Sequence, residues 1–218
     1  MRYTDELRFA YNLLTKPGAT AKRNMRAGNA LALYYKLSII PFIIFCAIGI
    51  LLVNSLPSVA MPSAMILFAS TLIPYIGSLA IIASAILFFW ILVPIGIAID
   101  SLIYQLVGRF FLNVFKGNYD KTFTAITFGV LPTMLFYWML LVPVLNIFYL
   151  VVATIWGIVV LVISLSSQQK ITRLQAAGAI AATAFLAILV VLLLVAGVAA
   201  GIAGAFAHSG MMGMGRYW

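Results

Sequence analysis

The sequence contains very little charge, cysteine or histidine. Only 8% of its 218 residues are Asp, Glu, Lys or Arg, whereas a typical globular domain has about 25%. The single cysteine, Cys46, lies within an apolar run, so an intrachain disulfide and a paired-cysteine metal motif are both excluded. One histidine and four carboxylates leave few possible acid–base pairs. We therefore expect no catalytic residue, no cofactor and no metal centre.

Sequence motifs of common enzymes are missing as well. The chain has no GxxxxGK[ST] phosphate loop, no HExxH zinc pair and no GxSxG nucleophile elbow. Its first 36 residues carry seven Lys/Arg and lack the short apolar core and cleavage site of a secretory signal. The prediction from these absences is a protein that is not an enzyme.

Long apolar runs are what the sequence does contain. The mean hydropathy is +1.18 and 65% of the residues are hydrophobic. About 20 residues in a helix, at about 1.5 Å each, cross a hydrocarbon core of about 30 Å. The alternation typical of a membrane barrel does not occur. We predict an all-α polytopic membrane protein with an N-terminal amphipathic helix and five transmembrane helices, at about 37–53, 81–99, 122–142, 147–165 and 174–200.

This prediction divides the chain into three parts. Residues 1–36 form a cytoplasmic amphipathic and basic segment, residues 37–207 a five-span membrane domain, and residues 208–218 a short extracytoplasmic tail. Within the membrane domain, the apolar stretch 64–74 is too short to span. It is compatible with an interfacial segment, a re-entrant segment or a helical overhang.

The N-terminal helix is predicted at residues 4–15. Thr4 can cap it, and Asp5 and Glu6 suit the positive end of its dipole. Such a helix can lie in the headgroup layer or pack on the protein's own helix ends. Its predicted apolar face consists of Tyr3, Leu7, Ala10, Tyr11 and Leu14.

The distribution of positive charge predicts the orientation. With five spans, 12 of the 13 Lys/Arg residues lie on one side of the membrane, and the other side holds only Arg216. The positive-inside rule then places the N-terminus in the cytoplasm and the C-terminus outside it. Anionic lipid headgroups or protein partners, rather than nucleic acid, are the expected ligands of this basic side. Its candidate residues are Lys22, Arg23, Arg26, Arg109, Lys116, Lys121, Lys170 and Arg173.

Two other groups of residues could carry chemistry. Asp100, at the end of the second span, is either an interfacial structural residue or part of an ion or proton path. Near the C-terminus, imidazole and thioether side chains could bind Cu(I), or this stretch could be a glycine-rich flexible tail. The residues concerned are His208, Met211, Met212 and Met214.

Small residues are frequent in the last predicted span. Gly197 and Gly201 form a small-xxx-small pair, which lets two helix backbones approach closely. The pair is predicted to pack helices, either within the chain or against a second copy or a partner subunit.

An ordered set of sequence elements resembles the Yip1-domain family of five-span membrane proteins. A proline-stopped segment precedes span one, a glycine-containing loop follows span two, span three carries a proline, span four carries Ile155 and Trp156, and a polar turn opens span five. The segments are LLTKPGATAKR (13–23), FKGNYDKTF (115–123), AITFGVLP (125–132) and KITRLQAA (170–177). The resemblance implies a cytoplasmic N-terminus and, among eukaryotic members, roles in vesicle trafficking with small GTPases. For compact prokaryotic-type members it implies no particular activity.

These observations lead to three functional hypotheses. The first is a non-catalytic membrane protein that organises the bilayer or recruits partners through its basic cytoplasmic face. The second is an accessory subunit of a larger transporter or respiratory assembly. The third is a small transporter or channel in its own right.

Overall fold

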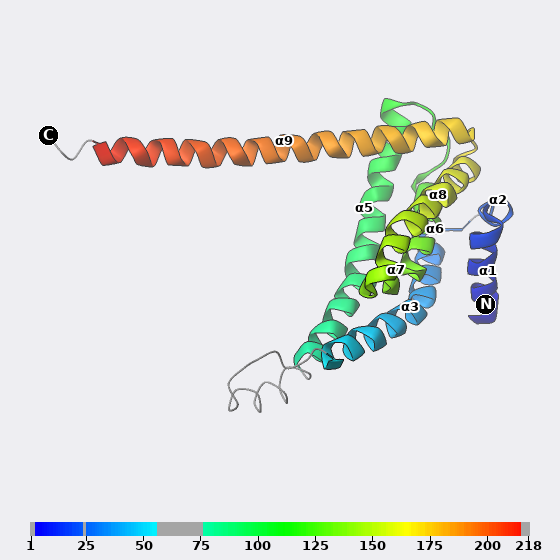
Figure 1. Ribbon diagram of the computed structural model, residues 1–218. Helices are drawn as coiled ribbons and strands as arrows, with labels where there is room; N and C mark the ends of the chain where they lie inside the picture. The colour runs from blue at the N-terminus through cyan, green and yellow to red at the C-terminus, as the bar shows by residue number, and fades with distance from the viewer. Residues whose placement is uncertain (1–2, 24, 56–75, 215–218) are drawn as a thin grey trace.

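The regular structure of the chain is helical throughout. The computed structural model describes residues 3–23, 25–55 and 76–214, and every regular element in them is a helix (Figure 1). Residues 76–86 are helical and continue directly into η1. The all-α prediction is therefore confirmed for this part of the chain. The elements are α1 (Tyr3–Thr15), α2 (Pro17–Thr20), α3 (Ala27–Ser55), the π-helix η1 (Leu87–Leu92), α5 (Val93–Leu106), the π-helix η2 (Val107–Phe111), α6 (Tyr119–Leu135), the 3-10 helix η3 (Tyr137–Leu141), α7 (Pro143–Phe148), the π-helix η4 (Tyr149–Ala153), α8 (Thr154–Gln169) and α9 (Arg173–Met214).

Four helical stretches in the described residues are long and apolar enough to cross a membrane. They correspond to the predicted spans one, two, four and five, and they fit an integral, multi-pass membrane protein. Predicted span three, 122–142, is not among them, because α6 has 17 residues and the chain tightens into η3 after it. A fifth crossing stays a prediction, and residues 64–74 lie outside the described residues. The four stretches are Ala27–Val53, Ile76–Phe111, Pro143–Gln169 and Arg173–Gly201.

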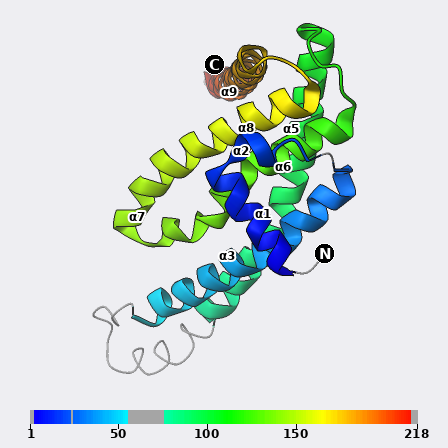
Figure 2. The ribbon, with the colours of Figure 1, turned by 90° about the vertical axis from the view of Figure 1, so that its right-hand side faces the viewer.

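Helix α6 is the centre of the bundle. Every residue from 122 to 129 is buried, and the helix packs against α8, α3 and α5 (Figure 2). It approaches α8 closely where two glycines meet. A Cβ on Gly129 would lie 2.8 Å from Leu161 Cβ, and a Cβ on Gly157 would lie 3.1 Å from the Gly129 carbonyl oxygen. The close approach of α6 and α8 therefore depends on these two glycines.

Helices α3 and α5 are joined through the π-helix η1. A π-helix shifts backbone hydrogen bonding from i−4 to i−5 and often lies where a chain has a specialised role. Here the Tyr34 hydroxyl donates to the Phe89 carbonyl at 2.8 Å, and the Tyr35 hydroxyl donates to the Trp90 carbonyl at 3.2 Å. These bonds and the rings around them fix α3 on α5. The surrounding ring contacts involve Phe42, Phe45, Phe88, Phe89, Trp90, Tyr137 and Tyr149.

Helix α9 leaves the bundle instead of completing it. Figure 1 shows it projecting sideways, and Figure 2 views it nearly end-on while α5 and α8 are seen along their lengths. Only its first turns pack on α5, η2 and α8, where Ala176, Ala179 and Thr183 are buried. All residues from 187 to 201 are exposed. Residues 187–201 are therefore not packed against other described parts of the chain, and packing of Gly197 and Gly201 against a second copy or a partner subunit stays a prediction.

Helix α1 extends over nearly the predicted residues but buries a different face. Phe9, Ala10 and Leu13 enter the core, whereas Tyr11 is 66% exposed. The Phe9 ring lies 5.3 Å from the Phe128 ring of α6. Lys36 Nζ forms an ion pair with Glu6 Oε1 at 2.8 Å. The helix thus packs on the protein's own helices, and the face predicted around Leu7 and Tyr11 is wrong because the Phe9 side anchors it.

Candidate functional site

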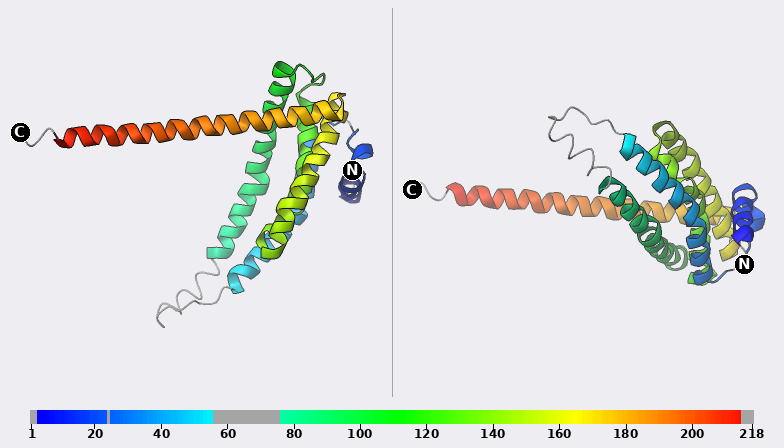
Figure 3. Two further views of the ribbon diagram at one scale, coloured as in Figure 1. Left: turned by 45° about the horizontal axis from the view of Figure 1, so that its top comes forward. Right: turned by 90° about the horizontal axis from the view of Figure 1, so that it is seen from below.

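Three basic segments that are far apart in sequence meet at one end of the bundle. They are residues 21–23 and 25–26 before α3, residues 107–118 (η2 and the loop after it) with the start of α6, and the α8–α9 turn 170–173. Figure 1 shows all three near the start of α9, and the left view of Figure 3 shows the same grouping from another direction. We call this region the basic end. It is the candidate functional site because it gathers the predicted basic residues.

Gln168 ties the first segment to α8. This side chain is 5% exposed, and its Nε2 donates to the carbonyls of Ala21 and Arg23, each at 2.8 Å. Backbone carbonyls in a loop need donors when they are covered. One buried amide therefore supplies both bonds and fixes the N-terminal basic segment on the bundle.

Gln169 ties the second segment to α8. Its Oε1 accepts the Gly117 backbone N–H at 2.6 Å, and its Nε2 donates to Thr122 Oγ1 at 2.7 Å. The Thr122 hydroxyl donates in turn to Gln105 Oε1, whose Nε2 donates to the Gly117 carbonyl at 3.1 Å. Thr122 and Gln169 are fully buried. The network is closed, so each of these buried polar groups has a partner.

Gly117 explains why the basic loop contains a glycine. A Cβ at this position would lie 2.6 Å from Gln169 Oε1 and 2.7 Å from Lys121 Cδ. Such distances are too short for a real side chain, so the close approach of the loop to Gln169 requires glycine. Gly108 plays a similar part in η2, where the Phe115 ring lies against it.

The third segment is a short turn with defined ends. Lys170 adopts a left-handed backbone conformation (φ 56°) and ends α8, while the Ile171 N–H bonds to the Ser166 carbonyl at 3.1 Å. Thr172 and Gln175 then form a reciprocal capping pair at 3.0 and 3.2 Å. This turn sets the direction in which α9 leaves the bundle.

The predicted basic residues are placed as follows. Arg23 is half-buried, with its guanidinium 5.2 Å from the centre of the Phe9 ring, so it also serves packing. Lys121 is half-buried over Gly117. The remaining six are exposed at the basic end: Lys22, Arg26, Arg109, Lys116, Lys170 and Arg173.

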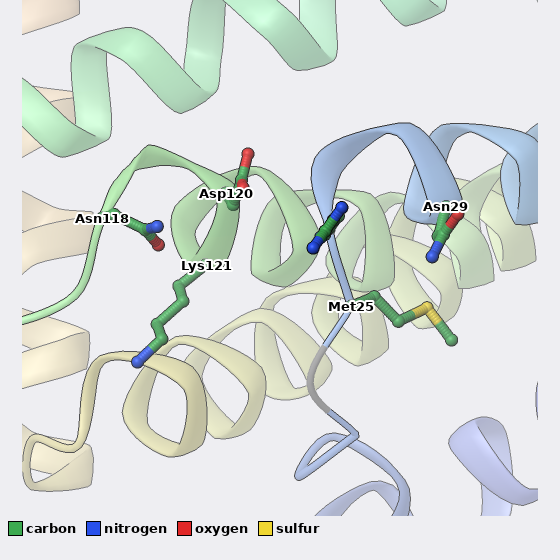
Figure 4. A pocket seen from close by; sticks show the side chains of 6 residues that line it. Met25, Asn29, Asn118, Asp120 and Lys121 are labelled. Carbon is green, nitrogen blue, oxygen red and sulfur yellow. The ribbon is translucent and has the colours of Figure 1, made fainter.

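A pocket of about 570 Å³ opens between the start of α3 and the start of α6. Figure 4 shows the side chains that line it, with Asn118, Asp120 and Lys121 contributed by the α6 side and Met25 and Asn29 by the α3 side. Arg26 completes the lining. A smaller pocket of about 300 Å³ shares Met25 and Asn29 and reaches the Glu6–Lys36 pair. Donor groups thus dominate the cavity at the basic end.

Tyr119 and Asp100 lie beside this site. Burial, followed by the nearby Asp120 carboxylate, raises the pKa of the Tyr119 phenol. The protonated hydroxyl donates to the Ala98 carbonyl at 3.1 Å. Asp100 is exposed on α5, between the residues of α5 that bond to Tyr119 and Gly117. It is close to the basic end along α5, and its role stays a prediction.

The other predicted sites are not brought together with the basic end. No group of three or more His, Cys, Asp or Glu side chains converges within the described part of the chain. Helix α9 continues through Met214, so residues 208–214 are helical instead of a flexible tail. The side chains of His208, Met211, Met212 and Met214 lie outside the described side chains. A Cβ on Gly197 or Gly201 would meet nothing within 4 Å.

Sequence reasoning missed the residues that assemble the site. Gln105, Gln168 and Gln169 hold the three segments together. The available signal was a pair of adjacent amides in SSQQ, at the end of a long apolar run, where side-chain amides can satisfy loop backbone. Searches against protein-family models, curated proteins and solved structures found no match. The Yip1-domain resemblance therefore stays a prediction.

Proposed function

We propose that this is a non-catalytic integral membrane protein, similar to Yip1-domain proteins, that organises the membrane or recruits partners through its basic end. In this proposal the basic end faces the cytoplasm. The observation that supports it is the assembly of three distant basic segments at one place by buried amide hydrogen bonds. A chain that needed only apolar spans would not need to hold these loops together.

Electrostatics explains what the assembly achieves. Each Lys or Arg near an anionic membrane surface contributes about 1 kcal/mol of attraction, which falls off within a Debye length of about 8 Å at physiological salt. Cations on separate mobile loops would act independently. Held on one rigid end, they present a combined positive surface to headgroups or to an acidic partner.

The orientation is tested by labelling single cysteines from one side of the membrane. In a Cys46→Ser background, Lys116→Cys and Lys170→Cys should react with a membrane-impermeant maleimide only from the cytoplasmic side. Arg216→Cys should react only from the other side. Labelling of positions 116 and 216 from the same side would contradict an odd number of crossings.

The lipid part is tested by the lipids that co-purify in mixed nanodiscs. We expect the wild-type protein to enrich anionic lipid, and a variant with K22Q, R109Q, K116Q and K170Q to lose most of that enrichment. All four side chains are exposed, so folding should be unchanged. Equal enrichment by both proteins, with matching thermal unfolding, would remove lipid attraction from the proposal.

A second candidate function is that of an accessory subunit of a larger membrane complex. The observation that favours it is the uncovered length of α9, whose residues 187–201 are all exposed in the described structure. A partner helix could pack there through Gly197 and Gly201. Native purification in mild detergent distinguishes this function from the first proposal, because a defined heteromeric species is expected only for a subunit of a larger complex.

A further inference from the structure

We propose that the pocket between the starts of α3 and α6 binds the phosphate group of a phospholipid headgroup. This inference rests on the proposed function, since a headgroup reaches the pocket only if the basic end faces a membrane leaflet. It goes further by naming one site and one chemical group, where the proposed function requires only a positive surface.

Four of the six side chains that line the pocket carry hydrogen-bond donors. Arg26 offers a guanidinium, Lys121 an ammonium, and Asn29 and Asn118 one amide each. Within the described residues, none of these four side chains forms a hydrogen bond or an ion pair. In particular, neither cation pairs with Asp120, although all three line the same cavity. The pocket therefore offers unused donors of the kind that phosphate oxygens accept from.

The backbone around the pocket adds to this preference. Asn118 precedes α6 without a side-chain cap, and α3 begins with its Gly28 position open to space. The Asn118 side chain thus leaves the first N–H groups of α6 without a side-chain cap. Free N–H groups at a helix start, together with the helix dipole, favour an anion. They act here alongside Arg26 and Lys121.

The two sides of the pocket are held at a defined separation. Thr124 Oγ1 of α6 lies 3.2 Å from the Met25 carbonyl, which immediately precedes Arg26, and 2.8 Å from the Asp120 carbonyl of its own helix. Thr124 is fully buried. The cavity thus opens beside a packed contact between α3 and α6, which holds the backbone on its two sides in place before a ligand binds.

Asp120 favours a lipid phosphate over free phosphate. A carboxylate in the cavity repels the doubly charged form of inorganic phosphate more than a singly charged diester. It can also accept a hydrogen bond from a hydroxyl group next to the diester, as in a glycerol headgroup. Beside the pocket, the Tyr119 hydroxyl donates to the Ala98 carbonyl and so holds the start of α6 against α5. Nearby on α5, the side chains of Ile99 and Leu102 are exposed. Acyl chains would have an apolar surface at this level.

The test is a titration of the full-length protein in detergent with phosphatidylglycerol, followed by native mass spectrometry. Arg26→Gln and Lys121→Gln should each weaken binding about tenfold or more, because each removes a charge-assisted hydrogen bond. Arg109→Gln and Lys170→Gln remove the same charge from the same end but outside the pocket. They should weaken binding by no more than about threefold.

Two further arms identify the ligand. Diacylglycerol of the same chain length should not bind at the site, and inorganic phosphate should compete only weakly with phosphatidylglycerol. Asp120→Asn should make inorganic phosphate a stronger competitor of phosphatidylglycerol. The control, Asp5→Asn on α1, removes a carboxylate outside the pocket and should not change the competition.

The outcomes separate this inference from the proposed function. If Arg26→Gln and Arg109→Gln weaken binding equally, the pocket is not the site, although a basic face can still attract lipid. If inorganic phosphate binds the wild-type protein as tightly as phosphatidylglycerol, the ligand is not a lipid. If none of the four cation variants changes binding, both the pocket and the lipid part of the proposed function fail.

Discussion

At the scale of single residues, the basic end depends on contacts that leave no room for an extra methyl group. Gly117 lies against Gln169, which is fully buried and bonded on both of its amide atoms. Displacing Gln169 would break its bonds to Gly117 and Thr122 together. A buried amide left without partners costs about 1–3 kcal/mol.

Gly117→Ala should therefore lower the free energy of unfolding by about 1–3 kcal/mol. The matched control is Gly28→Ala in the first turn of α3, where a Cβ would meet nothing within 4 Å. That variant should be neutral or more stable by up to about 1 kcal/mol, because alanine favours helix. Denaturant unfolding in detergent, followed by circular dichroism, measures both. A stable Gly117→Ala variant would show that the loop does not depend on this contact.

At the scale of helices, the close helix contact of the described structure uses a pair of glycines that the sequence analysis did not single out. The predicted pair, Gly197 and Gly201, contacts no described residue, whereas Gly129 and Gly157 bring α6 and α8 together. Glycines are distributed along several helices, and the sequence does not say which of them face a neighbour. Which glycines face a neighbouring helix depends on how two particular helices cross, and this crossing is set only in the folded chain.

Gly157→Leu should destabilise the bundle by about 1–3 kcal/mol or more, because the new side chain would meet the α6 backbone. Gly178→Leu on α9 is the control, since no atom lies within 4 Å of a Cβ there. It should leave the unfolding midpoint nearly unchanged. The comparison is made by thermal unfolding in detergent, and equal midpoints for the two variants would argue against the α6–α8 crossing.

At the scale of the whole molecule, α9 is the helix that projects away from the rest of the described bundle (Figure 1). Its apolar residues 187–201 are all exposed, and an apolar helix surface of this length is stable only in lipid or against another protein. The turn at 170–172 connects it to the bundle, where the apolar stretch Ile76–Phe111 is also largely unburied. The environment of α9 should therefore decide how it lies relative to the bundle.

Gly201→Leu tests whether that environment includes protein. Because nothing contacts Gly201 in the described structure, the variant should unfold like the wild type. If a partner helix packs there, the same change should abolish the heteromeric or homomeric species seen in native purification. An assembly that survives the substitution would indicate that lipid, and not this glycine pair, covers α9.

The sequence by itself determined the class of the molecule. Apolar runs of membrane length and the shortage of charge require helices that satisfy their own backbone, so an all-α fold with several membrane-length helices followed directly. The charge distribution predicted that the 107–121 loop and the 166–173 turn lie on one side of the membrane, and the Gly117–Gln169 bond shows that the two are in contact. The start of α1, its end and the start of α9 lie within one residue of the predicted bounds, and the predicted spans 37–53 and 147–165 lie inside longer helical stretches.

Only the tertiary structure decided which residues hold the three basic segments together. Gln168 and Gln169 look like an ordinary polar loop in sequence, yet they are buried because three loops need donors and acceptors at the same point. The same holds for the pocket, whose lining comes from residues 25–29 and 118–121. The sequence pattern of one segment indicates its secondary structure and its polarity. It does not report which segments will share a surface, because that depends on how helices cross and on which buried polar groups must find each other.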